Sequence, residues 1–245
     1  MTDEKPRKVD PAYPSSDAVS KAGEIAMGAV GSAAGLLVPV VGPAAVQAIL
    51  KNAVRLPMET RRNNWFNSIG EGLRELQDRL DGFDPNRLGE NEEFVSTIFE
   101  TTQMAVKTHR TEKLEALRNV VLNAAAGVQT DDVLRGAFLG YVDRFSSLHL
   151  KVLKLLSDPE SVPEMVDHVR QQRVNSLSAT LLSALPQSAN VVLLGKVLID
   201  LHREALIEQV DNDLLTDAFG CMLKRTTAEG DEFLRFIAEP AGGLS

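Results

Sequence analysis

The stretch Ile25–Leu50, with the sequence IAMGAVGSAAGLLVPVVGPAAVQAIL, has no charged residue and only two clearly polar ones, Ser32 and Gln47. Aliphatic residues, alanine and glycine fill nearly all of it. Removing such side chains from water is favourable, so the composition predicts burial. We therefore expect this segment to lie in a hydrophobic core or at a membrane.

Two prolines divide the stretch. Pro39 disfavours helix at the residue before it, and Pro43 suits the first position of a new helix. We predict a Gly/Ala-rich helical hairpin over residues 19–57, with arms near 17–38 and 43–56. The residues expected at its turn are Pro39, Gly42 and Pro43.

Glycines at helical spacing occupy one face of the first arm. Gly28, Gly31 and Gly35 are three and four residues apart, so another helix can approach them closely, as in packed membrane helices. The apolar part of this arm, residues 25–38, spans about 21 Å of helix, whereas a bilayer core is about 30 Å thick. Two placements stay open: association with a membrane, or burial inside a soluble helical bundle.

Positive charge and a tryptophan follow the hydrophobic stretch. Arg61, Arg62 and Trp65 have the character of residues that anchor a segment at a membrane–water interface. The two arginines also suit the end of a helix in a soluble protein. This pattern therefore supports both placements.

The middle of the chain has the pattern of amphipathic helices. From Thr60 to Leu80, apolar residues recur at spacings of three and four, which is typical of a helix with one buried face. The same pattern returns after each of several short breaks. Further helices are expected near 91–108, 114–124, 131–156, 163–185 and 191–207.

The C-terminal part has the element order of a small winged-helix-like module. Segments 205–211 and 221–226 each suit a short strand, and Thr227 is a cap-like start for a last helix. Acidic residues outnumber basic ones here, so we expect contact with protein rather than DNA. In the last helix we expect Phe233, Phe236 and Ile237 to pack against Val192, Leu193 and Val197.

Together these patterns predict a mainly α-helical protein: a helical bundle with an N-terminal Gly/Ala-rich hydrophobic hairpin and a small C-terminal winged-helix-like module. Its length of 245 residues is enough to bury a sizeable core. The expected organisation is a flexible tail over 1–18, the hairpin over 19–57, a helical domain over 58–160, and a helical region with the module over 161–245.

Charge and cysteine content argue against several classes of protein. A net charge of −8 counts against a nucleic-acid partner, because nucleic-acid binding requires basic surface to neutralise phosphates. Cys221 is the only cysteine, so the chain has no intramolecular disulfide and no multi-cysteine zinc site. The histidines lack metal-ligand spacing, and we expect no metal and no cofactor. The first residues lack the apolar core of a signal peptide, which predicts a cytoplasmic protein, with peripheral or integral association with the inner membrane as alternatives.

One short motif supports an enzymatic alternative. The run Arg144-Phe145-Ser146-Ser147-Leu148-His149 resembles the Arg-x-x-x-x-His motif of HEPN-type ribonucleases, which are also all-helical. The resemblance implies RNA cleavage by Arg144 and His149, although Phe145 stands where those enzymes place a polar residue. Because such short matches also occur by chance, we predict that the protein is not an enzyme and keep the ribonuclease as an alternative.

Several stretches carry a second resemblance: 38–42, 59–62 with Trp65, 91–94, Phe145 with His149, Asp158-Pro159, and two further segments. One is Glu112–Asn119, EKLEALRN, followed by Leu122-Asn123-Ala124. The other is a Thr-x-x-Gly-x-x-Phe pattern at Thr227, Gly230 and Phe233. Over roughly residues 38–238, these stretches resemble a group of bacterial helical proteins. The hairpin, the helices after it and the Thr-x-x-Gly-x-x-Phe close are similar in outline to the abortive infection alpha family, whereas the Glu-Lys-Leu segment is this chain's own. The resemblance implies a role in bacterial defence against phage without known catalytic residues.

The favoured function is therefore a non-enzymatic bacterial defence or stress effector. Its hairpin would associate with the membrane, and its C-terminal module would bind a protein partner or a second copy of the chain. A soluble helical adaptor that keeps the hairpin in its core is the first alternative. A ribonuclease using Arg144 and His149 is the second.

Overall fold

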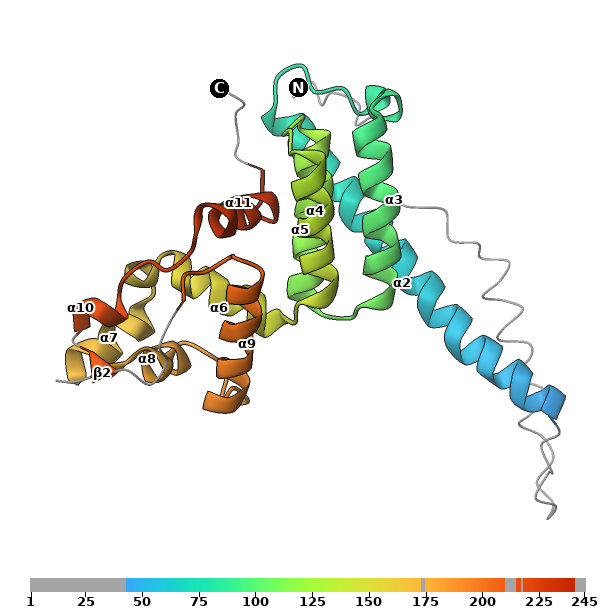
Figure 1. Ribbon diagram of the computed structural model, residues 1–245. Helices are drawn as coiled ribbons and strands as arrows, with labels where there is room; N and C mark the ends of the chain where they lie inside the picture. The colour runs from blue at the N-terminus through green and yellow to red at the C-terminus, as the bar shows by residue number, and fades with distance from the viewer. Residues whose placement is uncertain (1–42, 173–174, 210–214, 217, 241–245) are drawn as a thin grey trace, which may run out of the picture. The chain divides into compact units, whose positions relative to one another are not determined.

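The computed structural model describes residues 43–172, 175–209, 215–216 and 218–240, and helices dominate this part of the chain. This confirms the predicted mainly α-helical class (Figure 1). The chain divides into two compact units after Lys107, within the range 58–160 that the sequence pattern groups together. Most of the predicted hairpin lies outside the described residues, including Gly28, Gly31, Gly35, Pro39 and Gly42.

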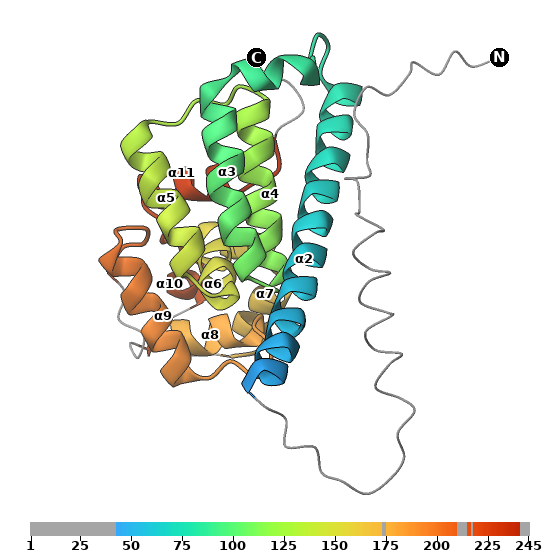
Figure 2. The same ribbon diagram turned by 90° about the vertical axis from the view of Figure 1, so that its right-hand side faces the viewer.

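The first unit is built from α2 (Pro43–Arg79), the 3-10 helix η1 (Pro85–Glu90) and α3 (Glu92–Lys107). Figures 1 and 2 show α3 running back along the C-terminal half of α2, with η1 at the connection. Asn91 begins α3 by accepting a hydrogen bond from the backbone N–H of Phe94 (3.1 Å). The buried side chains of the two long helices are Trp65, Ile69, Leu73 and Leu76 of α2 and Thr97, Thr101 and Ala105 of α3.

Helix α2 corrects the predicted break near residue 57. The sequence predicts one helical arm that ends near residue 56 and a second helix that begins near Thr60, whereas α2 starts at Pro43 and continues through Pro57 to Arg79. A proline inside a helix removes one backbone hydrogen bond and disturbs one turn, but the helix can continue on both sides. The second arm and the following helix are therefore one element.

The second unit contains eight α-helices in its described residues, together with η2 (Pro159–Ser161). Two-residue strands, β1 (Asn175–Ser176) and β2 (Leu215–Thr216), pair antiparallel. Helix α4 packs against α5, α6 and α11, and α6 packs against α9. The α-helices are α4 (Thr111–Ala125), α5 (Asp132–Arg144), α6 (Ser147–Ser157), α7 (Pro163–Gln171), α8 (Leu177–Ser183), α9 (Val191–Arg203), α10 (Ala218–Cys221) and α11 (Ala228–Phe236).

An aromatic cluster joins α5 to α11. The Phe138 ring lies 5.4 Å from the ring of Phe233 and 5.4 Å from that of Phe236, centre to centre. Tyr141 meets Phe233 edge-on at 5.6 Å. Offset and edge-to-face pairs of this kind add to the stabilisation from burial. The prediction that Phe233 packs against Val192 and Leu193 is therefore wrong, since both of those side chains are exposed.

The predicted helix over 131–156 is interrupted in the structure. Helix α5 ends at Arg144, Phe145 is extended, and Ser146 begins α6. The backbone N–H of Ser146 donates to Nδ1 of His149 (3.3 Å), which satisfies one end group of the new helix. Phe145 is buried at this break and stacks on Tyr141, with ring centres 5.5 Å apart. Capping and burial together therefore favour the break over a continuous helix.

After Leu156, the helices and strands are also shorter than predicted. The expected helix over 163–185 is split into α7 and α8 by β1. The two expected strands, 205–211 and 221–226, are reduced in the described residues to one antiparallel bridge between Ile207 and Thr226. They do lie side by side, because the N–H of Glu208 donates to the carbonyl of Arg225 (2.9 Å).

Candidate functional site

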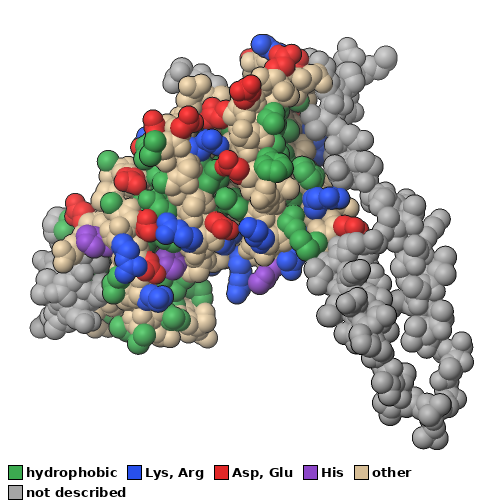
Figure 3. Space-filling view, turned by 45° about the vertical axis from the view of Figure 1, so that its right-hand side comes forward, with side chains coloured by type: hydrophobic (Ala, Val, Ile, Leu, Met, Phe, Trp, Pro, Cys, Tyr) green, Lys and Arg blue, Asp and Glu red, His purple; other side chains and the backbone are tan. Residues whose placement is uncertain are grey.

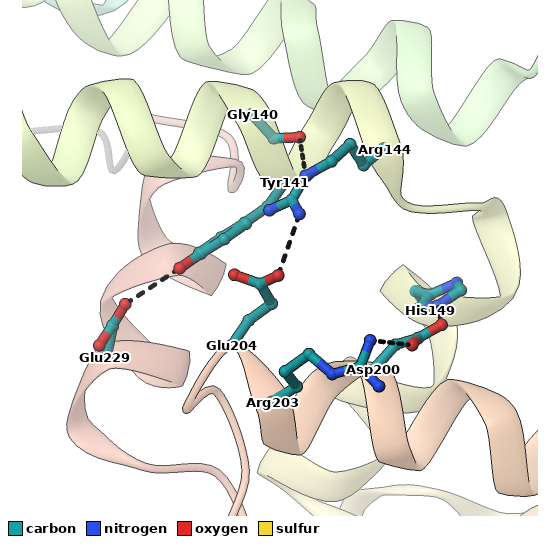
Figure 4. A network of polar contacts seen from close by, with 8 residues as sticks. All are labelled: Gly140, Tyr141, Arg144, His149, Asp200, Arg203, Glu204 and Glu229. Atoms are coloured by element: carbon teal, nitrogen blue, oxygen red, sulfur yellow. Dashed lines mark hydrogen bonds and ion pairs between the residues drawn. The ribbon is translucent and has the colours of Figure 1, made fainter.

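The side chains of the ribonuclease-like motif lie on both sides of the break between α5 and α6. Arg144 is the last residue of α5, and its Nη1 donates to Glu204 Oε1 (3.0 Å) at the end of α9. Its Nε also donates to the carbonyl of Gly140 (3.4 Å), and its guanidinium lies 5.5 Å from the centre of the Tyr141 ring. Figure 4 shows this arginine between the tyrosine and the glutamate. Arg144 therefore links the end of α5 to the end of α9.

His149 is held separately, in the first turn of α6. Its ring stacks on Phe145, with centres 4.9 Å apart and planes 7° apart. Nδ1 accepts from the N–H of Ser146, and Nε2 lies 3.4 Å from Oδ2 of Asp200. Burial lowers the pKa of His149 below its usual value of 6.5, against the opposing effect of Asp200. The imidazole is therefore neutral at pH 7, with Nδ1 as acceptor and Nε2 as donor.

The two motif residues contact two different carboxylates, Asp200 in α9 and Glu204 at its C-cap. Asp200 and Glu204 are four residues apart, so they share a face of the helix. Asp200 also lies 3.5 Å from Nη1 of Arg203. In Figure 4 the Arg144 and His149 side chains are directed to separate partners rather than to a common point. The arrangement can fix the α5–α6 break against α9, and each group that would be needed for RNA cleavage has a partner within the chain.

Helix α4 carries a second set of polar contacts, made by the EKLEALRN segment. The Glu112 carboxylate accepts from Ser147 Oγ (3.0 Å) and pairs with Lys151 Nζ (2.9 Å), both in α6. Lys113 Nζ donates to the carbonyl of Asp143 (2.7 Å) in the last turn of α5. A carboxylate at a helix start and a cation at a helix end both interact favourably with the helix dipole. Glu112 and Lys113 therefore stabilise the ends of two neighbouring helices.

Two asparagines of the same helix hold the end of α11. Asn119 Nδ2 donates to the carbonyl of Ile237 (3.0 Å). Asn123 Nδ2 donates to the carbonyls of Phe236 (3.1 Å) and Ala238 (2.9 Å). The last carbonyls of a helix have no partner within it, so these bonds replace water at a buried end. The polar residues of the segment thus have a structural role in this unit.

The Thr-x-x-Gly-x-x-Phe pattern begins α11 against the end of α9. Thr227 Oγ1 accepts from the N–H of Gly230 (3.0 Å) and donates to the carbonyl of Ala205 (2.6 Å). A Cβ at Gly230 would lie 2.0 Å from the carbonyl oxygen of Leu206, so only glycine fits there. Phe233 then enters the aromatic cluster. The EKLEALRN helix and the Thr-x-x-Gly-x-x-Phe segment are thus connected through α11.

The outer face of α9 has a different character. Val191, Val192, Leu193 and Ile199 are exposed, and the side chain of Val192 is 81% exposed. An open hollow of about 510 Å³ lies along Gly195 and is bordered by Lys196 and Arg203. Contiguous exposed aliphatic side chains beside charged ones are typical of a binding surface. We refer to Val191, Val192, Leu193, Gly195, Lys196 and Ile199 as the α9 surface.

The residues proposed for a membrane interface have different environments. Arg61 and Arg62 are exposed, and Nη1 of Arg61 lies 3.4 Å from the carbonyl oxygen of Val106. Trp65 is only 3% exposed, and its Nε1–H donates to Oγ1 of Thr102 (2.9 Å). The assignment of Trp65 as an exposed anchor is therefore corrected, because its ring packs between α2 and α3. Pro43 begins α2 as expected for a first helical position.

Two further findings concern metal ligation and membrane crossing in the described part of the chain. Among those residues, no three of His, Cys, Asp and Glu gather closely enough to ligate a metal ion. None of the helices described there combines the length and the apolar character that crossing a bilayer requires. Comparisons with protein-family models, curated proteins and solved structures found no match to this chain.

Proposed function

We propose that the protein is a non-enzymatic bacterial defence or stress effector that acts by binding. Its C-terminal module, formed by α9, the Ile207–Thr226 bridge and α11, contacts a protein partner through the α9 surface. Residues 19–57 associate with the membrane. The observation that carries the proposal is the exposure of four aliphatic side chains on a helix whose other face is firmly buried.

The α9 surface differs from the inner face of the same helix. Leu194, Val197, Leu198 and Leu201 are buried in the unit, whereas the outer aliphatic residues meet solvent. Exposing several large aliphatic side chains in a row has a cost that burial by a partner removes. Gly195 has no atom within 4 Å of its would-be Cβ, which leaves room for a partner side chain. These features favour a protein ligand.

The polar network supports a non-enzymatic role. Arg144 pairs with Glu204, and His149 is engaged by Ser146 and Asp200. A catalytic pair needs a reacting atom within reach of both groups. Figure 3 also shows basic and acidic side chains interspersed over the face in view, unlike the basic stripe expected of an RNA-binding surface.

Substitutions at two positions test the protein-binding part of the proposal in the full-length protein. A photo-crosslinking amino acid at Val192 should capture one discrete partner in bacterial cells. The matched control is Val133 on α5, which is 80% exposed and should give no such product. The purified partner should bind the wild type and lose at least tenfold affinity with Val192→Asp, but not with Val133→Asp. Equal behaviour at the two positions would contradict the proposal.

A flotation experiment tests the membrane part. The full-length protein should float with vesicles of anionic bacterial lipid, whereas a variant lacking residues 19–42, with α2 intact, should remain in solution. Exposed Arg61 and Arg62 would lie near the lipid headgroups, so Arg61→Glu with Arg62→Glu should weaken flotation. A full-length protein that never floats would leave the soluble adaptor as the function.

A further inference from the structure

The first unit leaves a second hydrophobic face exposed, on α3. The inner face of α3 packs on α2 through Thr97, Thr101 and Ala105. On the outside, Phe99 is 68% exposed and Val95 is 46% exposed, one turn apart. A hairpin of two helices can bury only the faces that meet each other, so adjacent apolar residues on an outer face are available to a further partner.

We propose that this face binds the same face of a second copy of the chain, with the two α3 helices antiparallel and the two-fold axis near Phe99. Phe99 of each copy then packs beside Phe99 of the other. The contact is isologous and closes after two copies, as in most homodimers. Two helical hairpins that meet in this way form a four-helix bundle.

The charges of α3 select the antiparallel direction. The first turn carries Glu92 and Glu93, and the last turn carries Lys107. A parallel pair would place the acidic ends together, whereas an antiparallel pair places Glu92 opposite Lys107 of the second copy. Antiparallel helix dipoles add to this preference.

The same axis also pairs the polar residues of the face. Ser96 and Gln103 are both exposed, and the proposed register places each opposite the other residue of the second copy. The apolar centre therefore has a polar rim at both ends, which is the usual composition of an interface between proteins. All of these residues lie on one helix of the first unit.

The size of the face predicts a weak dimer. Helix α3 has 16 residues and is about 24 Å long, so its outer face alone is smaller than the roughly 800 Å² that each partner contributes to a stable complex. A dissociation constant on the order of tens of micromolar is therefore expected. The dimer would form where the protein is concentrated, for example on a membrane.

Sedimentation of the full-length protein between about 1 and 200 µM tests the dimer. The wild type should shift from monomer to dimer, and Phe99→Glu should remain monomeric with an unchanged helical spectrum and Tm. Val133→Glu, at an even more exposed position of the second unit, should dimerise like the wild type. A wild type that stays monomeric overturns the proposal, as does a dimer that is insensitive to Phe99→Glu.

Cysteine crosslinking tests the register. In a Cys221→Ala background, a mixture of Ser96→Cys and Gln103→Cys proteins should crosslink efficiently with a short bismaleimide. Each variant alone should crosslink several-fold less, because like positions lie about 10 Å apart along the axis in this register. Stronger crosslinking of either variant alone would exclude the antiparallel arrangement.

Discussion

Helices α3 and α4 follow one another in the chain and have nearly the same length, 16 and 15 residues, but they are used differently. Three residues of α3 are buried, against eight of α4. The buried hydroxyl of Thr101 donates to the carbonyl of Thr97 in its own helix (2.7 Å). The buried amide of Asn123 donates instead to carbonyls beyond residue 235.

The difference shows what each helix contributes. Helix α4 supports its unit, because its polar side chains occupy the ends of α5, α6 and α11. Helix α3 has one inner face and leaves Phe99 exposed, so its free face is available for binding. In α4, the polar residues of the motif-like EKLEALRN segment make structural contacts. In α3, a sequence without such a motif carries the candidate interface.

The largest effect is expected where α11, the helix held by α4, approaches the end of α9. In Gly230→Ala the new Cβ would lie 2.0 Å from the carbonyl oxygen of Leu206, and backbone must move. We expect a loss of about 3 kcal/mol or more in the free energy of unfolding, at or above the upper end for overpacked sites. Urea denaturation followed by circular dichroism measures it.

Gly136→Ala in α5 is the matched control. A Cβ there meets no atom within 4 Å, and alanine is the better helix former. We expect a gain of up to about 1 kcal/mol. If both glycine variants lose stability equally, the close contact at Gly230 is not the cause.

The second effect compares the two helices directly. Asn123→Ala removes two hydrogen bonds to the end of α11 and leaves buried carbonyls without a donor, so we expect a loss of about 2 kcal/mol. Thr101→Val removes a bond within α3 only and should cost less than about 1 kcal/mol. Equal losses, measured by the same denaturation, would mean that α4 is no more important to stability than α3.

The helical class and the approximate position of most helices could be predicted from the spacing of apolar residues. The break at Ser146 could not, because the pattern over 131–156 continues through it. What decides the break is distant: Phe145 is drawn into a cluster with Phe233 of α11. Local periodicity contains no information about that contact.

The candidate site was harder to predict than the fold. Val191-Val192-Leu193-Leu194 are four aliphatic residues in a row, so their spacing does not show which of them point inward. In the structure Leu198 and Leu201 are buried, and they determine which face of α9 points into the core. Leu194 lies on that face and is buried, whereas Val192 is exposed. The asparagines at 119 and 123 were visible as a four-residue spacing, but the helix end that they bind lies more than a hundred residues away.

The third effect concerns the first unit. Thr102→Val removes the acceptor of the Trp65 Nε1–H, which is buried between α2 and α3. An unsatisfied buried donor should cost about 1 kcal/mol or somewhat more. The expected readout is lower stability together with a changed tryptophan emission, since Trp65 is the only tryptophan. Unchanged emission would indicate that Trp65 is not held by this bond.

The smallest expected effect concerns Glu112 of α4, which makes the stability of the protein depend on pH. Hydrogen bonds from Lys151, from the backbone and from Ser147 lower the pKa of Glu112 from 4.5 to about 2. A carboxylate with a lowered pKa in the folded state stabilises the protein fully above its unfolded value of about 4.5. That contribution is lost as the pH falls toward 2, because the folded protein must then also bind the proton.

Glu112→Gln should therefore be less stable than the wild type at pH 6, and the difference should shrink steadily between pH 4.5 and 2. Because many other carboxylates titrate in this range, the quantity to compare is the difference between the two proteins at each pH. Glu115→Gln makes the same charge change on the exposed side of α4 and should show no such trend. Glu112 is partly exposed, which screens its pair with Lys151, so the effect stays below that of Asn123. A constant difference from pH 6 to pH 2 would mean that the carboxylate charge does not hold α4 to α6, and that packing alone joins the two helices.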